Sequence, residues 1–243
     1  ALGTIDCLEW MSSSRGALIP LFHAWNNDFR IAPAGGEDSL ANMESQRLPG
    51  IMRSYAYLGE NFNLQGWTEA LKKGHIFLSS GPVPEFSVGG KMPGESITLP
   101  PGGGTVRITG TVRSRTPLIS VRIYSNGTVW KDIPAAGKRE VRFSEQATVS
   151  ASRWFSLVAE AEETRPAPGA FGQAVSNAVR VYVGTQPIRS RASARYYLDW
   201  LEKLRPQVSD PSLYRSEREM NSVLARIEEA AAVYRKRMEE AQP

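Results

Sequence analysis

The chain has 243 residues, of which 41% are hydrophobic and 22% charged, with a formal net charge of +4 and a single cysteine. This composition is ordinary for a globular protein with one large domain or two smaller ones, and it excludes an intrachain disulfide and a cysteine-based zinc site. No run of about 20 apolar residues occurs, so no membrane-spanning helix is expected. The basic residues are scattered or alternate with glutamates near the C-terminus, so no nucleic-acid surface is expected either.

Residues 1 to 83 alternate strand-like and helix-like segments, a pattern that predicts a parallel α/β architecture. A helix is expected over 17–27, and Asn63 and Gly74 are expected to begin and end a second one. Four strands are expected, at 4–9, 29–34, 51–57 and 75–79. The first residues lack the regions of a signal peptide and open directly onto a strand-like segment, so we expect the chain to be cut from something longer.

Residues 84–184 change pattern. Short alternating segments are separated by turn residues about every ten positions, which predicts an antiparallel immunoglobulin-like β-sandwich of about seven strands. Asn126-Gly127 is a strong hairpin turn. A one-residue slip would exchange the faces of a strand. The expected core is therefore Val106, Ile108, Val121 and Ile123, with either Trp154 or Phe155 and either Leu157 or Val158.

Residues 185–243 are expected to form two helices. Ser190 can cap the first, which Pro206 should end, and Ser216 with Glu219 forms a capping box for the second. The second helix carries an apolar stripe from Met220 to Met238. Such a stripe is costly to leave in water, so we expect both helices to pack on the rest of the protein.

The most informative segment is Gly35-Gly36-Glu37-Asp38-Ser39, which follows a short apolar run. Glycines allow a sharp turn or a close approach to a ligand, and Glu37 or Asp38 could bind a metal or act as a base. The alternative is a structural turn in which Asp38 or Ser39 caps a following helix. Both roles can hold together.

The two histidines fit structural roles better than ligand roles. His23 falls on the helix expected over 17–27, near Trp25, where a lone histidine is more often packed than ligated. His75 follows a helix C-terminus, where the helix dipole favours a partly positive imidazole. Ser79-Ser80-Gly81 lacks the surrounding pattern of a serine nucleophile.

Three segments, taken in succession, resemble the C-terminal part of the PHP-type metallohydrolases, in the carbaryl-hydrolase-type branch. They are residues 28–39 (DFRIAPAGGEDS), 49–58 (PGIMRSYAYL) and 67–82 (WTEALKKGHIFLSSGP). The resemblance implies the C-terminal part of a distorted (β/α) barrel over 1–83, with catalytic metals at the C-terminal strand ends. An immunoglobulin-like sandwich over 84–184 and helices over 185–243 would follow.

The resemblance also implies site residues. Asp38 matches the late metal-ligand Asp of the family, and Glu37 is a neighbouring candidate ligand. Leu40 stands where many members have a ligand His, and the early His-x-His pair has no counterpart. Arg53 matches a recurrent basic position and could orient a substrate, or form a salt bridge at a strand end. A divalent metal (Zn, Mn or Fe) is expected in the full-length parent, and this chain alone could lack one.

Two functions are therefore open. The first is the C-terminal portion of a metal-dependent hydrolase of ester, amide, carbamate or phosphoester bonds, inactive as the isolated chain. Its partner would be the missing N-terminal half of the barrel or a second copy, its substrate a small molecule, and its location periplasmic or extracellular. The second is a non-catalytic module, in which the sandwich and helices bind a partner or carbohydrate within a larger protein.

Overall fold

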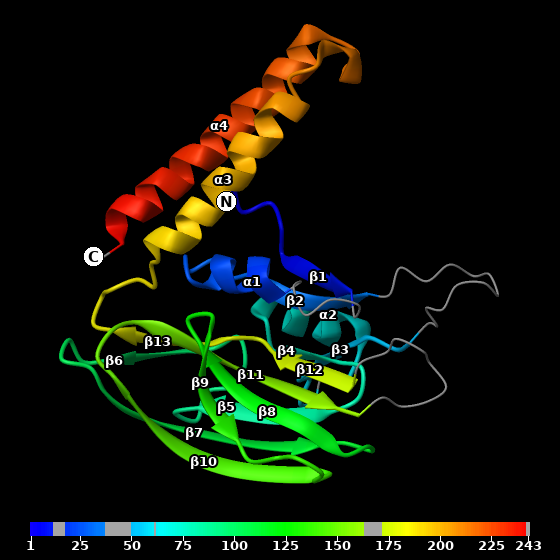
Figure 1. Ribbon diagram of the computed structural model, residues 1–243, viewed down its shortest axis with the longest axis vertical. Coiled ribbons are helices and arrows are strands. Elements are labelled where there is room, and N and C mark those ends of the chain that lie inside the picture. The colour runs from blue at the N-terminus through cyan, green and yellow to red at the C-terminus, as the bar shows by residue number, and fades with distance from the viewer. Residues whose placement is uncertain (12–17, 37–49, 61, 163–171, 242–243) are drawn as a thin grey trace.

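The structure is a computed structural model that describes residues 1–11, 18–36, 50–60, 62–162 and 172–241. Figure 1 shows stacked layers of strands, a short α/β unit on top of them, and a pair of long helices that projects away as an arm. None of the helices in these ranges is long and apolar enough to cross a membrane.

The α/β unit consists of two parallel strands and one helix. Strand β1 (Cys7–Met11) pairs in parallel with β2 (Ala32–Gly36), and helix α1 (Leu18–Trp25) lies between them in sequence. The predicted parallel arrangement is thus present here. It does not continue: β3 (Arg53–Ala56) runs antiparallel to β4 (Ile76–Ser79), with helix α2 (Leu64–Lys73) between them in sequence. Asn63 caps α2 and Gly74 ends it in the left-handed conformation, as predicted.

The predicted strand over 29–34 starts later than expected, at Ala32. The chain leaves α1 through Asp28, which has a φ of 58°, and the Phe29 N–H still donates to the Ala24 carbonyl at the end of that helix. The ring of Phe29 packs against Tyr234 of the arm. Phe29 is therefore apolar because it anchors the arm and not because it belongs to a strand.

Two sheets pack face to face, which confirms the predicted sandwich. The smaller sheet has the order β10-β7-β5, made of β5 (Val83–Val88), β7 (Gly104–Arg113) and β10 (Glu140–Val149). The larger sheet has the order β3-β4-β12-β11-β13-β6, with β8 pairing with β11 and β9. Its further strands are β6 (Ser96–Leu99), β8 (Leu118–Ser125), β9 (Thr128–Ile133), β11 (Arg153–Ala161), β12 (Gly172–Ser176) and β13 (Val179–Val183).

The larger sheet crosses the division expected at residue 83. Strand β4 pairs antiparallel with β12, so that Leu78 lies opposite Val175, and β3 extends the same sheet through β4. The segment expected to belong to a barrel is thus hydrogen-bonded into the sandwich. This pairing joins residues about a hundred positions apart, which no local sequence pattern reveals.

The core lies on both faces of β11. Phe155 and Leu157 pack between the sheets with Val106, Ile108, Val121 and Ile123, which settles the predicted alternatives. Trp154 and Val158 point the other way, into a second cluster with α1. Fully burying a large apolar side chain contributes roughly 1.5–3 kcal/mol. The α/β unit is therefore held firmly on the sandwich.

The arm consists of α3 (Arg191–Gln207), a short 3₁₀ turn (Pro211–Leu213) and α4 (Glu217–Glu240). Ser190 and Ser216 cap the two helices as predicted, while Pro206 lies inside the last turn of α3 instead of beyond it. The helices pack on each other through Leu198, Ala231 and Tyr234. Figure 1 shows that only the base of the arm touches the rest of the protein.

Candidate functional site

The carboxyl ends of β1 and β2 form the edge to which the sequence analysis assigned a metal site. Two glycines shape this edge. A Cβ at Gly36 would collide with the Glu9 carboxylate, and a Cβ at Gly35 would lie 3.2 Å from the backbone carbon of Arg53. The Gly35 N–H donates to the Ser54 hydroxyl at 2.8 Å. The glycines thus allow a carboxylate from β1 and the start of β3 to reach the backbone of β2.

The residues predicted to bind metal lie outside the described residues. Glu37 and Asp38 begin the segment 37–49. The same segment contains Ser39, the alternative helix cap, and Leu40, which stands where many members of the family have a ligand His. Arg53 is described: it is exposed at the first position of β3, and its guanidinium NH1 donates to the Tyr55 hydroxyl at 3.2 Å. Its backbone lies beside Gly35 of β2, and its side chain is open to solvent.

Glu9 is the functional candidate that sequence reasoning missed. It reads as the last polar residue of an amphipathic strand, and only its contact with Gly36 places it at the carboxyl edge. The double glycine is the signal that could have pointed to it, since such a pair often marks a close approach of another group.

The described ranges do not contain a complete set of metal ligands, because no three His, Cys, Asp or Glu side chains converge there. Glu9 is the one carboxylate that the described part of the chain brings onto Gly36. Three or four protein ligands are usual for a hydrolytic zinc centre. The described residues therefore do not fit a metal on their own.

His23 is packed, as the sequence interpretation favoured. Its ring stacks on Tyr196 with centroids 3.9 Å apart, and its Nδ1 lies 2.9 Å from the Ser193 hydroxyl. Burial lowers the pKa of His23, so the neutral imidazole is favoured. His75 does not lie at the carboxyl edge. It lines a cavity beside Ala32, at the other end of β2.

The serines before Pro82 organise a turn. The Ser79 hydroxyl donates to the Pro82 carbonyl and accepts from the Gly81 N–H at 2.8 Å. The Ser80 hydroxyl accepts from the Gln173 N–H at 3.0 Å. These hydrogen bonds fix the passage from β4 to β5, which agrees with the absence of a serine-nucleophile motif.

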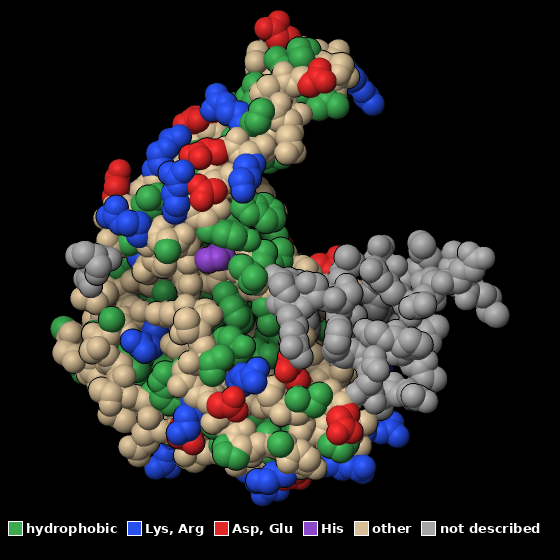
Figure 2. Space-filling model, viewed as in Figure 1, with side chains coloured by type: hydrophobic (Ala, Val, Ile, Leu, Met, Phe, Trp, Pro, Cys, Tyr) green, Lys and Arg blue, Asp and Glu red, His purple; other side chains and the backbone are tan. Residues whose placement is uncertain are grey.

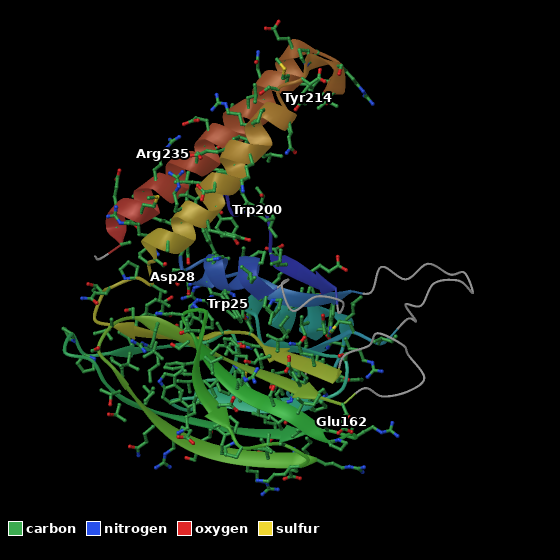
Figure 3. The ribbon with its side chains drawn as sticks, viewed as in Figure 1. Trp25, Asp28, Glu162, Trp200, Tyr214 and Arg235 are labelled. Atoms are coloured by element: carbon green, nitrogen blue, oxygen red, sulfur yellow. The ribbon has the colours of Figure 1, made fainter. Side chains whose placement is uncertain are left out.

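Asp28 lies where the arm, the α/β unit and the sandwich meet, as Figure 3 shows. Its carboxylate accepts from the Tyr182 hydroxyl at 2.7 Å and lies 3.5 Å from Arg180 Nε and 3.9 Å from Arg189 NH1. Burial, followed by the hydrogen bond to Asp28, raises the pKa of Tyr182. One carboxylate thus contacts Tyr182 and Arg180 of β13 and Arg189 just before the arm, so the role of this junction is structural.

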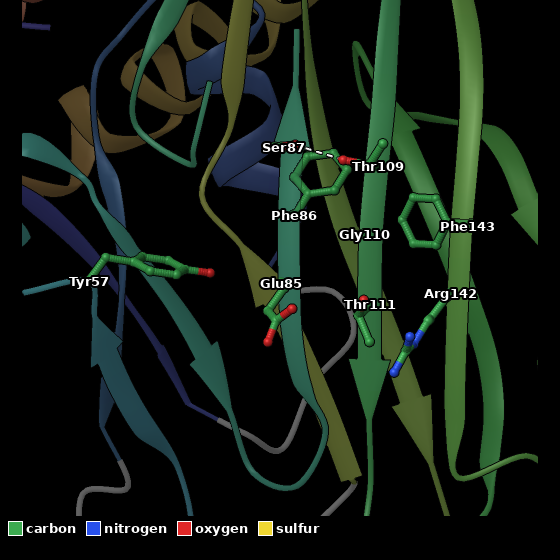
Figure 4. Close-up of a pocket in the computed structure, with 9 residues that line it drawn as sticks. All are labelled: Tyr57, Glu85, Phe86, Ser87, Thr109, Gly110, Thr111, Arg142 and Phe143. Atoms are coloured by element: carbon green, nitrogen blue, oxygen red, sulfur yellow. Dashed lines mark hydrogen bonds between the residues drawn. The ribbon is translucent and has the colours of Figure 1, made fainter. Parts of the chain in front are cut away.

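A cavity of about 410 Å³ lies on the smaller sheet beside Tyr57 (Figure 4). Figure 4 shows the Tyr57 ring directed toward Glu85 and the Phe143 ring beside Gly110. Glu85 is paired with Arg113 at 2.8 Å, and the Ser87 and Thr109 hydroxyls are hydrogen-bonded at 2.8 Å. Because these polar groups satisfy one another, the cavity offers little chemistry to a ligand.

The hollow between the arm and the body carries hydrophobic side chains, whereas acids and bases alternate along the outside of the arm (Figure 2). Large apolar side chains that are more than half exposed include Ile5 at 61% in the N-terminal segment, Ile19 at 51% on α1 and Trp200 at 56% on α3. This is the composition of a surface that a further polypeptide can cover.

Comparisons with known proteins add little on function. No family model matches the chain, and neither does any of the curated proteins. Among solved structures, the fibronectin(III)-like modules of Clostridium thermocellum CbhA are similar over 41% of this chain and 94% of that chain, with 20% identity and a TM-score of 0.28. A likeness this weak supports no statement about fold or activity.

Proposed function

We propose that the chain supplies one wall of the active site of a metal-dependent hydrolase acting on ester, amide, carbamate or phosphoester bonds. The observation that carries the proposal is the carboxyl edge of β1 and β2, where Glu9 lies on Gly36 and the chain enters Glu37-Asp38. Ligands in α/β proteins bind at the carboxyl ends of parallel strands. The resemblance of residues 28–39 to PHP-type metallohydrolases points to the same edge.

The remaining walls would come from polypeptide that pairs with β1. Strand β2 lies alongside β3 and β4, but in the described ranges no strand pairs with the other edge of β1. Two-stranded parallel sheets are rare, because parallel sheets are normally larger and covered on both faces. Added strands at this edge would continue the barrel implied by the resemblance and bring the missing ligands.

In such a site this chain would contribute carboxylate and guanidinium groups. Glu9 would supply a hard oxygen or accept a proton, and Arg53 would orient a substrate oxygen by charge-assisted hydrogen bonds. Since the described residues hold no complete ligand set, we assign no metal-dependent step to the isolated chain.

The test begins with the coding sequence immediately before Ala1. We expect it to encode a His-x-His pair, and the longer protein to hydrolyse aryl esters or carbamates with Zn, Mn or Fe, whereas the 243-residue chain does not. Glu9→Gln and Arg53→Gln in the longer protein should each lower kcat/KM roughly 10–100-fold, the range seen for groups that tune a metal site. Arg107→Gln, an exposed change on β7, is the control and should leave kcat/KM unchanged.

Two results would overturn the proposal: metal-dependent turnover by the 243-residue chain alone, or no turnover of any of the four bond classes by the longer protein. The second result would favour the alternative, a non-catalytic module in which the sandwich and the arm bind a partner.

A further inference from the structure

A second cavity, of about 280 Å³, lies between the end of α2, the segment before β2 and the start of β13. No Asp or Glu is among its lining residues. Basic side chains from three parts of the fold line it: Arg30, Lys72, Lys73, His75 and Arg180. Clustered cations in a concave site repel one another and attract anions.

Arg180 is the most buried of these basic side chains, and Asp28 compensates its charge in part. Its side chain is 2% exposed, its NH2 donates to the Phe29 carbonyl at 2.9 Å, and its buried Nε has no hydrogen-bond acceptor. Asp28 lies 3.5 Å from Nε, yet the same carboxylate oxygen already accepts from Tyr182. Burial lowers the pKa of Arg180; Tyr182 and Asp28 oppose that shift, and the charge of Arg30 adds to it. A buried cation of this kind is stabilised by an added anion.

Three of the five basic residues have a second explanation. Lys72 and Lys73 stand in the last turn of α2 and His75 follows its C-terminus, where the helix dipole favours positive charge. That effect does not account for Arg30 and Arg180, which come from other elements and meet the lysines at the same cavity.

The wall of the cavity is preformed. Gly74 ends α2 with its N–H directed to the Ala70 and Leu71 carbonyls, and the Asn177 amide donates to the Gly74 carbonyl at 2.8 Å. Gly94 packs directly on Gly74, since a Cβ there would meet the Gly74 backbone. These contacts engage carbonyl oxygens at the end of α2, whose partial negative charge would otherwise repel an anion. The basic side chains remain along the lining of the cavity.

We propose that this cavity binds a small phosphate-bearing anion, either inorganic phosphate or a phosphate monoester. Arg forks and Lys ammonium groups are the side chains that recognise phosphate in proteins. The volume is at the lower limit of small-molecule pockets, roughly 300–1,000 Å³, which suits a small ligand. The cavity touches Ala32, whereas the carboxyl edge begins at Gly36, about 13 Å away at roughly 3.3 Å per strand residue. It is therefore separate from the proposed hydrolase site.

The test is calorimetric titration of the 243-residue chain with inorganic phosphate, phenyl phosphate and acetate at constant ionic strength. One phosphate or phenyl phosphate should bind per chain, and acetate should bind at least tenfold more weakly. The variant Arg30→Gln/Lys73→Gln changes two exposed side chains and should weaken phosphate binding by about tenfold or more, with circular dichroism confirming its fold. Lys138→Gln, an exposed change outside the cavity, should bind like the unmodified chain.

The pattern of affinities identifies the source of the phosphate. Tighter binding of phenyl phosphate would support a monoester ligand, and tighter binding of inorganic phosphate would support the free ion. Absence of saturable binding of both, equal affinity for acetate, or an equal loss in Lys138→Gln would overturn the proposal.

Discussion

Trp154 couples the sandwich to the α/β unit, and replacing it with phenylalanine should destabilise the protein strongly. The side chain is fully buried, and its ring centroid lies 5.0 Å from that of Trp25 and 5.2 Å from that of Phe22. Its indole N–H donates to Asn26 Oδ1 at 2.7 Å. Trp154→Phe keeps an aromatic ring on β11 but removes this donor and part of the packing.

The expected loss has two parts. Leaving the Asn26 oxygen without its buried donor costs about 1–3 kcal/mol, and the smaller ring leaves a space that costs about 1–2 kcal/mol more. The free energy of unfolding should therefore fall by roughly 2–5 kcal/mol, out of the 5–15 kcal/mol typical of a folded protein. Urea unfolding followed by circular dichroism at the helical band measures this loss, because the arm and α1 contribute most of that signal.

Trp200→Phe is the matched control. The same chemical change is made on α3, where the side chain is 56% exposed, so the free energy of unfolding should change by no more than about 0.5 kcal/mol. Equal unfolding midpoints for the two variants would refute the reasoning. A double-mutant cycle with Asn26→Ala should give a coupling energy of about 1 kcal/mol or more, and strict additivity would show that the hydrogen bond is not the cause.

Three further changes test packing and burial. Gly110→Ala should cost about 1–3 kcal/mol, because its Cβ would meet the Phe143 ring and lie 2.8 Å from a backbone oxygen, whereas Gly102→Ala has open space and should be neutral in the same urea titration. Burial lowers the pKa of His23, so the unfolded chain takes up the proton more readily and stability should fall as the pH drops below about 6.5; His23→Gln should flatten this part of the urea-midpoint profile. Burial raises the pKa of Tyr57 to about 12, so the unfolded chain loses its proton first and stability should fall from about pH 10 to about pH 12. Tyr57→Phe should reduce that loss, and unchanged pH profiles in both variants would contradict the burial argument.

Local chemistry explains what could be predicted of the fold. Asn63 and Gly74 bound α2 because a side-chain oxygen at the start and a left-handed residue at the end satisfy backbone groups of the helix itself. The turn at Asn126-Gly127 is equally local, since both residues adopt positive φ, 49° and 88°, between β8 and β9. These signals act within a few residues, so they can be read without knowing the rest of the chain.

Long-range contacts explain which parts of the fold could not be predicted from the sequence. The sequence around β11 is almost continuously apolar, so no alternation distinguishes Trp154 from Phe155, and both prove buried on opposite faces. The burial of Trp154 depends on α1, which lies about 130 residues earlier. The same holds for the candidate sites: Glu9 meets Gly36 through the parallel register of β1 and β2, and Arg180 meets Arg30 only at a cavity between distant segments.

The arrangement of layers suggests why a sandwich accompanies the proposed active-site wall. Strand β2 is tied to the start of β3 through Ser54, and β3 continues into the larger sheet through β4. On the other side, α1 is packed into the cluster around Trp154. Groups that bind or react must be held within a fraction of an ångström of their productive positions, and rigid elements do this better than loops. The sandwich therefore acts as the support of the carboxyl edge, so a mutation such as Trp154→Phe would loosen Glu9 and Arg53 without touching either.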